Sequence, residues 1–107
     1  MVTERYAKVS PEIPPVITDG RKVVSTSGMR ETLVAAATPA KGVIIMAVST
    51  NTGVVAVGGV TVVAATGTQQ GIRLNAGDSV TIPISDLQSV YLDVTVSGNS
   101  VVYTKVV

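Results

Sequence analysis

The sequence predicts an all-β protein: a small antiparallel β-sandwich or barrel of about eight short strands, jelly-roll-like, with an extended N-terminal arm. Valine makes up about a fifth of the 107 residues, while Phe and Trp are absent. Stiff, β-branched side chains favour extended backbone, so this composition indicates strands. After residue 30, short apolar runs alternate with turn residues at the spacing typical of sandwiches and barrels. The length fits one domain.

The predicted strands cover nearly all of the chain after residue 30. They are 33–38, 42–49, 54–57, 60–66, 71–74, 79–84, 90–96 and 100–106. Segment 42–49 is apolar at almost every position, which predicts a central strand covered on both faces. Pro83 cannot donate a hydrogen bond to a neighbouring strand, so 79–84 is predicted to be an edge strand.

Strand 90–96 has the alternation of a half-buried strand. Its apolar residues are predicted to face the core, and Tyr91, Asp93 and Thr95 to face outward; the core residues are Val90, Leu92, Val94 and Val96.

Three turns are predicted from local chemistry. Gly58-Gly59 indicates a two-residue hairpin joining 54–57 to 60–66, because glycine supplies the positive φ that such turns require. Residues 97–99 (Ser-Gly-Asn) indicate a second tight hairpin. Asp86 is expected to cap a single helical turn at residues 86–88.

Residues 1–30 are predicted to form the arm, and residues 31–107 the β-domain. Pro11, Pro14 and Pro15 favour extended backbone, and apolar residues in this stretch show no clean period. We expect the arm to dock on a neighbouring copy or on another protein. The alternatives are a floppy terminus, or an edge strand added to the domain's own sheet through residues 22–25.

The residue inventory disfavours an enzyme. The chain has no Cys and no His, which removes thiolate chemistry and the commonest general base and metal ligand. Its acidic residues after the arm are scattered and suit turns, caps and polar faces; they are Glu31, Asp78, Asp86 and Asp93. We therefore predict no catalytic, cofactor-binding or metal-binding residues, and no cofactor. A calcium site at Asp78 and Asp86 is disfavoured, because such sites draw more oxygens from one short loop.

Nucleic acid and membranes are not expected partners. The basic residues form no stripe interleaved with aromatic residues. The longest apolar stretch, 54–65, is shorter than the roughly 20 residues that span a bilayer. Gly58-Gly59 lacks the Lys-Ser or Lys-Thr pair of a phosphate loop. Gln69 and Gln70 could bind a sugar, but no Trp or Phe is present to stack on it.

Segments 54–57 and 60–65 are apolar on both faces. Uncovered strands of this kind aggregate unless something shields them. Either another part of the chain covers them, or another subunit does. The second reading predicts a homo-oligomer, with a trimer as the first expectation and with Val55 and Val62 at the interface.

A run of sequence landmarks spans 31–107. "RETLVAAAT" leads into "GVIIMAVSTNTGVVAVGG", and "GIRLNAGDSVTIPISDLQSVYLDVTVSGNSVVYTKV" follows. This pattern resembles small tailed-bacteriophage virion proteins of the capsid decoration (cement, or head auxiliary) type. The resemblance covers about three-quarters of the chain and carries over no active-site residue.

The resemblance implies a structural protein that binds between major capsid subunits and stabilises the capsid. Its partners would be further copies of itself, as a homotrimer, and the major capsid protein. It would lie on the capsid surface of the virion after assembly in the host cytoplasm. The alternatives are a neck, tail or fibre-associated assembly component of the virion, and a surface carbohydrate-binding module.

Overall fold

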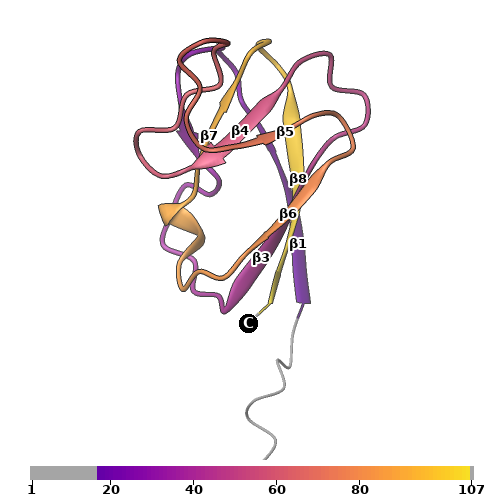
Figure 1. Cartoon of the computed structure of the whole chain (residues 1–107). Helices are drawn as coiled ribbons and strands as arrows, with labels where there is room; N and C mark the ends of the chain where they lie inside the picture. Colours follow the sequence, from indigo (N-terminus) through magenta and orange to yellow (C-terminus); the bar gives the residue numbers. More distant parts are fainter. Residues whose placement is uncertain (1–16, 107) are drawn as a thin grey trace, which may run out of the picture.

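The computed structural model describes residues 17–106, which form two four-stranded antiparallel sheets packed against each other (Figure 1). The first sheet has the order β1-β8-β3-β6, and the second has the order β2-β7-β4-β5. The strands are β1 (Ile17–Val23), β2 (Glu31–Thr32), β3 (Gly42–Ala47), β4 (Val55–Gly58), β5 (Ile72–Leu74), β6 (Ser79–Ile82), β7 (Tyr91–Val94) and β8 (Ser100–Val106). The predicted all-β sandwich is confirmed.

Most connections carry the chain from one sheet to the other. Only β4 and β5 are consecutive strands that pair with each other. The turn at 97–99 therefore joins β7 of the second sheet to β8 of the first, and the prediction of a hairpin there is wrong. Local chemistry identified this turn correctly, since Gly98 has a φ of 89°, but it could not show which strands the turn joins.

The core lies between the two sheets and consists of aliphatic side chains. β3 contributes Val43, Ile45 and Ala47, and the facing side is built from Val55, Val57, Leu74, Leu92 and Val94. Leu33, Leu87 and Val90 close one end of the sandwich, together with the 3-10 turn Leu87–Ser89. The predicted cap is confirmed, because the Asp86 side chain accepts a hydrogen bond from the Gln88 N–H.

β3 occupies an inner position of the first sheet, but the described residues cover only one of its faces. Val43, Ile45 and Ala47 are buried, whereas Ile44 and Met46 are 44% and 38% exposed. The expectation of cover on both faces is therefore wrong. β6 lies at an edge of the sheet, as Pro83 predicted.

The predicted hairpin at Gly58-Gly59 is also wrong. β4 pairs with β5 and β7, while residues 60–66 form no strand and make a single bridge between Val63 and Gln70. The turn after β4 is closed by the Val62 N–H, which donates to the Gly59 carbonyl, and neither glycine has a positive φ.

Two further strand boundaries differ from the prediction. Segment 33–38 is not a strand; the chain pairs only at β2 and at a bridge between Pro39 and Asp86. β7 ends at Val94, so Val96 leaves the core and is 40% exposed.

The boundary placed at residue 31 must move toward the N-terminus. β1 pairs with β8 along its whole length, from Ile17 opposite Val106 to Val23 opposite Ser100, and Val24 is fully buried in the core. The alternative of an edge strand in the domain's own sheet therefore holds for this part of the chain, over a longer range than 22–25. Charged residues and Gly20 hid the strand, because an edge strand needs little apolar surface. The rest of the predicted arm, with its three prolines, lies outside the described residues.

Candidate assembly surfaces

The carboxylates considered above are all held by neighbouring groups of the chain. Lys22 Nζ lies 2.7 Å from Glu31 Oε1, and the Ser25 N–H donates to Glu31 Oε2. The Lys22 hydrogen bond, with that of Ser25, holds the pKa of Glu31 below its ordinary value. Asp78 accepts from the Asn75 N–H in its turn. These contacts give both side chains structural roles.

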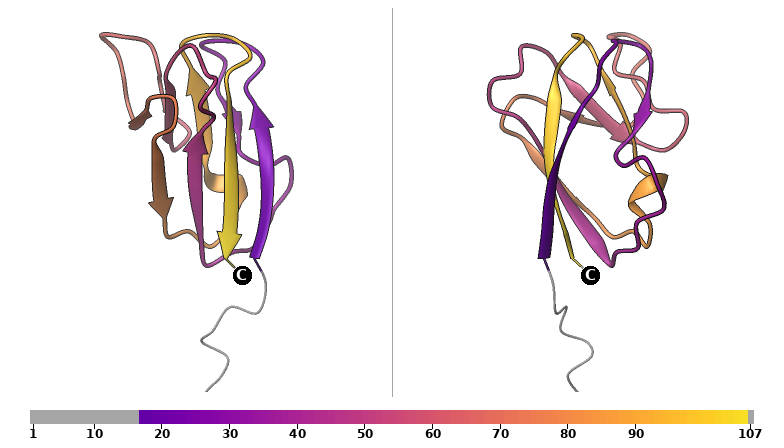
Figure 2. Two further views of the ribbon diagram at one scale, coloured as in Figure 1. Left: turned by 90° about the vertical axis from the view of Figure 1, so that its right-hand side faces the viewer. Right: turned by 180° about the vertical axis from the view of Figure 1, so that it is seen from behind.

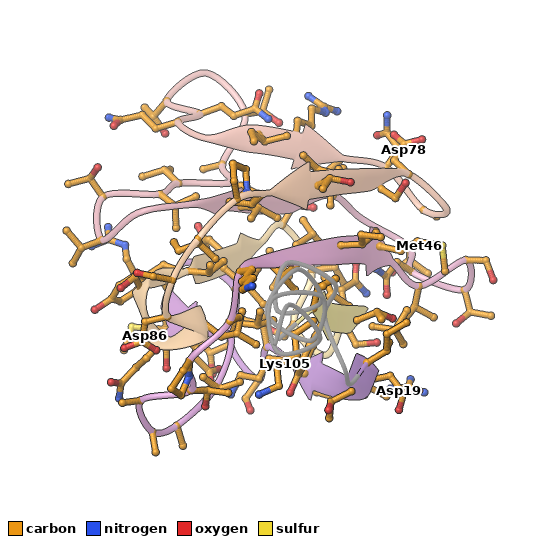
Figure 3. The ribbon with its side chains drawn as sticks, turned by 90° about the horizontal axis from the view of Figure 1, so that it is seen from below. Asp19, Met46, Asp78, Asp86 and Lys105 are labelled. Carbon is orange, nitrogen blue, oxygen red and sulfur yellow. The ribbon has the colours of Figure 1, made fainter. Side chains whose placement is uncertain are left out.

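Asp86 accepts hydrogen bonds from the N–H groups of Thr38 and Gln88. These two bonds, that of Thr38 first, hold the pKa of its carboxyl below the ordinary value. Asp86 and Asp78 lie on opposite sides of the molecule in Figure 3, too far apart to share one ion. Within residues 17–106, no three acidic side chains gather into a possible metal site.

Asp93 has a role that its position in the sequence did not reveal. It is only 3% exposed, and its Oδ1 accepts from the N–H of Gly28 while its Oδ2 accepts from the N–H of Ala64. Oδ1 also accepts from the Val94 N–H. The side chain does point to the outer face of β7, as alternation predicted, but two loops cover that face. Asp93 fixes both loops to the second sheet.

Those loops give the outer face of the second sheet a small core of its own. Ala56, Val62 and Ala64 are buried together, with the Tyr91 ring packed against them. Arg30 Nε donates to the Val62 carbonyl, which joins the two loops to each other. Most of the apolar surplus at 54–65 is thus covered from within the chain, although Val60, in the turn after β4, is 61% exposed. The placement of Val55 and Val62 at a subunit interface is therefore wrong, since both are buried inside the domain.

The outer face of the first sheet has no such cover from the described residues. Figure 2 (left) shows this face with β1, β8, β3 and β6 side by side. Ile44 and Met46 lie opposite Thr104 and Val102 of β8 and opposite Thr81 and Ser79 of β6. The only charged side chains that these strands place on the face are Asp19 and Arg21, both on β1.

Figure 3 shows Asp19 and Met46 on the same side of the molecule. At the lower end of this face is an open hollow of about 380 Å³, lined by Lys41, Gly42, Val43, Ile44, Thr81, Ile82, Pro83 and Val106. A smaller hollow of about 290 Å³ opens between the sheets where β5 and β6 form their edges, lined by Val57, Gly58, Gly59, Ile72, Ile82, Ile84, Ser89 and Val90. Neither lining contains an acidic residue or an aromatic side chain, so the two hollows suit apolar protein contacts better than polar ligands.

The remaining polar candidates are isolated. Lys105 Nζ lies 3.3 Å from the Pro39 carbonyl, and Lys41 is exposed. Gln70 is engaged through its main chain with Val63. The buried Nε2 atom of Gln69 has no hydrogen-bond partner among the described residues. None of these side chains gathers with others into a sugar-binding or catalytic constellation.

No protein-family model, curated protein or solved structure matches this chain. The described residues include no helix that is long and apolar enough to cross a membrane. The fold and its surfaces define the class of protein: an all-β sandwich whose two outer faces differ, one covered by loops of the chain and one that residues 17–106 leave uncovered.

Proposed function

We propose that this chain is a structural, non-enzymatic subunit of a tailed-phage virion, which decorates and stabilises the capsid by binding between major capsid subunits. The observation that carries the proposal is the outer face of the first sheet. It spans four strands, exposes Ile44 and Met46, and confines its strand charges to Asp19 and Arg21 on one edge. Depletion of charge at the centre of a patch is a feature of protein interfaces.

The role is mechanical. A decoration protein adds buried area at junctions between capsid subunits and so opposes the outward pressure of packaged DNA. Many modest contacts, made by linked copies, bind more firmly than one copy alone. A homotrimer remains our first expectation, on the resemblance of 31–107 to decoration proteins, and the major capsid protein remains the expected partner.

The first experiment measures the copies of this chain in purified particles of the phage that encodes it, by quantitative mass spectrometry. Hundreds of copies per particle support a shell protein. Six, twelve or a few trimers favour the alternative, a neck, tail or fibre-associated component. Absence from purified particles contradicts both.

The second experiment tests the face itself with two matched variants. Ile44→Lys places a charge on the outer face of the first sheet, and Val96→Lys places the same charge in the turn between β7 and β8, outside the lining of both hollows. Ile44 and Val96 are 44% and 40% exposed, so the substitutions are alike in chemistry and exposure. We expect Ile44→Lys to weaken binding to capsids that lack the protein by about tenfold or more, and Val96→Lys to bind normally. Equal binding by both variants would contradict the proposal that the outer face of the first sheet binds the capsid.

A further inference from the structure

β1 ends the first sheet with an open edge. It is seven residues long and forms the right-hand border of the sheet in Figure 2 (left), and among the described strands it pairs only with β8. The other sheet has much shorter edges, since β2 and β5 have two and three residues. An exposed edge of this length offers a row of main-chain groups to another strand.

The hydrogen bonds at the ends of the ladder show which residues of β1 offer those groups. Val24 donates to the Asn99 carbonyl and accepts from the Gly98 N–H, so the main chain of Val24 faces β8. Because this direction alternates along a strand, the main-chain groups of residues 23, 21, 19 and 17 face the open edge. The hydrogen bonds of β8 give the same alternation. The carbonyls of Ser100 and Val106 accept from residues next to β3, so the main-chain groups of residues 101, 103 and 105 face β1.

The four residues with free main-chain groups are all exposed, and among residues 17–106 no group outside the β8 ladder bonds to their main chain. Their side chains also share the outer face of the sheet, in the order Ile17, Asp19, Arg21 and Val23. The order is complementary to itself when reversed: an apolar residue stands at each end, and opposite charges flank Gly20.

We propose that a second copy of this chain pairs with β1, antiparallel and around a two-fold axis at Gly20, so that the two first sheets become one continuous sheet. In this register Asp19 lies opposite Arg21 of the second copy, and Ile17 lies opposite Val23. Each such pair joins residues whose main-chain groups face the edge, and so exchanges two hydrogen bonds. A shift by two residues in either direction would place Asp19 opposite Asp19, or Arg21 opposite Arg21. Charge complementarity therefore selects one register.

The centre of the edge suits close approach of two main chains. Gly20 has no side chain, and the Tyr103 ring covers its inner side so closely that a Cβ there would lie 2.5 Å from Tyr103 Cζ. On the inner side, Lys22 is already paired with Glu31 of its own chain and needs no partner from the second copy. Arg21 is held weakly, with Nη2 3.4 Å from Ser100 Oγ, and is available to the second copy's Asp19.

This contact goes beyond the proposed function and makes a different prediction about symmetry. A two-fold contact gives assemblies with an even number of copies: a dimer or, if the chain also trimerises, a hexamer. The test is sedimentation velocity on the full chain, over roughly 1 to 100 µM. A monomer throughout, or a trimer with no larger species, overturns the inference; a trimer leaves the capsid proposal intact.

Charge reversal then tests the register. Asp19→Arg and Arg21→Asp each place like charges opposite one another, twice per contact, and we expect each to weaken association by about tenfold or more. The double variant restores opposite charges and is expected to recover association. Arg73→Asp, the same change at an exposed position of β5, is the control and is expected to leave association unchanged. If the single variants associate normally, or the double variant stays dissociated, the register is wrong.

A second variant tests the main chain rather than the charge. Arg21→Pro removes an N–H that faces the open edge and is not used by the β8 ladder, so the domain is expected to stay folded. We expect it to associate more weakly than Arg21→Ala, which removes only the side chain. Equal association by these two folded variants would contradict strand pairing at β1.

Discussion

The two outer faces of the sandwich differ in whether loops of the described chain cover them. The second sheet is covered by two loops, which bury Ala56, Val62 and Ala64 and are fixed by the carboxylate of Asp93. The first sheet leaves Ile44 and Met46 half in solvent. The comparison shows that apolar content alone does not identify the surface that the chain leaves uncovered. Most of the apolar segment 54–65 is buried, with Val60 as an exposed exception, whereas the uncovered face is rich in Thr, Ser and Val.

The largest effect is expected from removing the carboxylate that fixes the loops. Asp93→Ala leaves the N–H groups of Gly28 and Ala64 without their acceptor, the Ala64 bond being buried and the Gly28 bond partly buried. Hydrogen bonds to charged groups contribute about 1.5 to 3 kcal/mol each, so we expect the free energy of unfolding to fall by roughly 3 kcal/mol or more. Urea denaturation measures this. Asp78→Ala, which removes an exposed carboxylate that accepts one main-chain hydrogen bond in its turn, is the control. A similar loss in both variants would contradict a distinct role for the buried carboxylate.

The next effect concerns the packing beneath those loops. Val62 is 2% exposed, and Val62→Ala removes two methyl groups from the small core on the second sheet. We expect a loss of about 1.5 to 3 kcal/mol, made up of lost burial and a partly unfilled cavity. The matched variant Val102→Ala removes the same methyl groups from the uncovered face of the first sheet, where Val102 is only half-buried, and is expected to cost clearly less. If Val62→Ala changed the oligomeric state without lowering stability, Val62 would belong to a subunit interface rather than to the small core.

Acid is expected to weaken the link between β1 and β2 that Lys22 and Glu31 form. The folded pKa of Glu31 lies below its ordinary value of 4.5, because Lys22 and the Ser25 N–H bind its charged form. The stability from this pair is therefore complete above about pH 4.5 and is lost as the pH falls through the lower, folded pKa. The Glu31 side chain is 31% exposed and screened by solvent, so the pair is expected to contribute about 0.2 to 1 kcal/mol to the free energy of unfolding. Asp86, whose pKa is also lowered, adds to the loss in the same direction.

Thermal melts of the wild type and of Glu31→Gln, between about pH 6 and pH 3, separate this contribution. Glu31→Gln is expected to begin with a lower melting temperature and to lose less on acidification. Parallel curves for the two proteins would show that Glu31 does not contribute to the pH dependence.

The smallest effect is expected on the uncovered face. Ile44→Lys places a charge where the side chain already meets solvent, and its stability is expected to stay within about 0.5 kcal/mol of the wild type. Chemical denaturation measures this. A small change would also show that weaker capsid binding by Ile44→Lys is not caused by unfolding. A large loss would mean that Ile44 supports the fold.

Sequence reasoning succeeded where a strand has one face in the core and one in solvent. The alternation in β7 correctly predicted Leu92 and Val94 as core residues, and Pro83 correctly placed β6 at an edge. It failed where tertiary contacts decide the outcome. Nothing local to Val62 shows that its segment leaves the sheet and folds over β4, and nothing local to Asp93 shows that two distant loops supply its hydrogen-bond donors.

The edge strand β1 was missed for a different reason. An edge strand on an open face buries few side chains. Ile17–Val23 therefore has almost no apolar alternation, and its sequence predicts an extended arm rather than a strand. The strand that β1 pairs with is β8, and the sequence correctly predicted a strand at 100–106. The charged residues that obscured the strand are the ones on which the proposed edge contact depends. In this chain the strand with the weak sequence signal is therefore the one at which we propose the edge contact.

The position of β8 within the first sheet also sets the order in which the fold can form. β8 lies between β1 and β3, yet it follows both in the chain, and Val23 pairs with Ser100. On a ribosome, which releases the N-terminal part first, β1 has no strand to pair with and β3 lacks one of its two neighbours until Ser100–Val106 emerges. Such non-local pairing makes folding slow, on the order of milliseconds to seconds for comparable all-β domains. During that interval the edges of β1 and β3 are open to other chains, and an incomplete chain that stops before Ser100 remains in that exposed state.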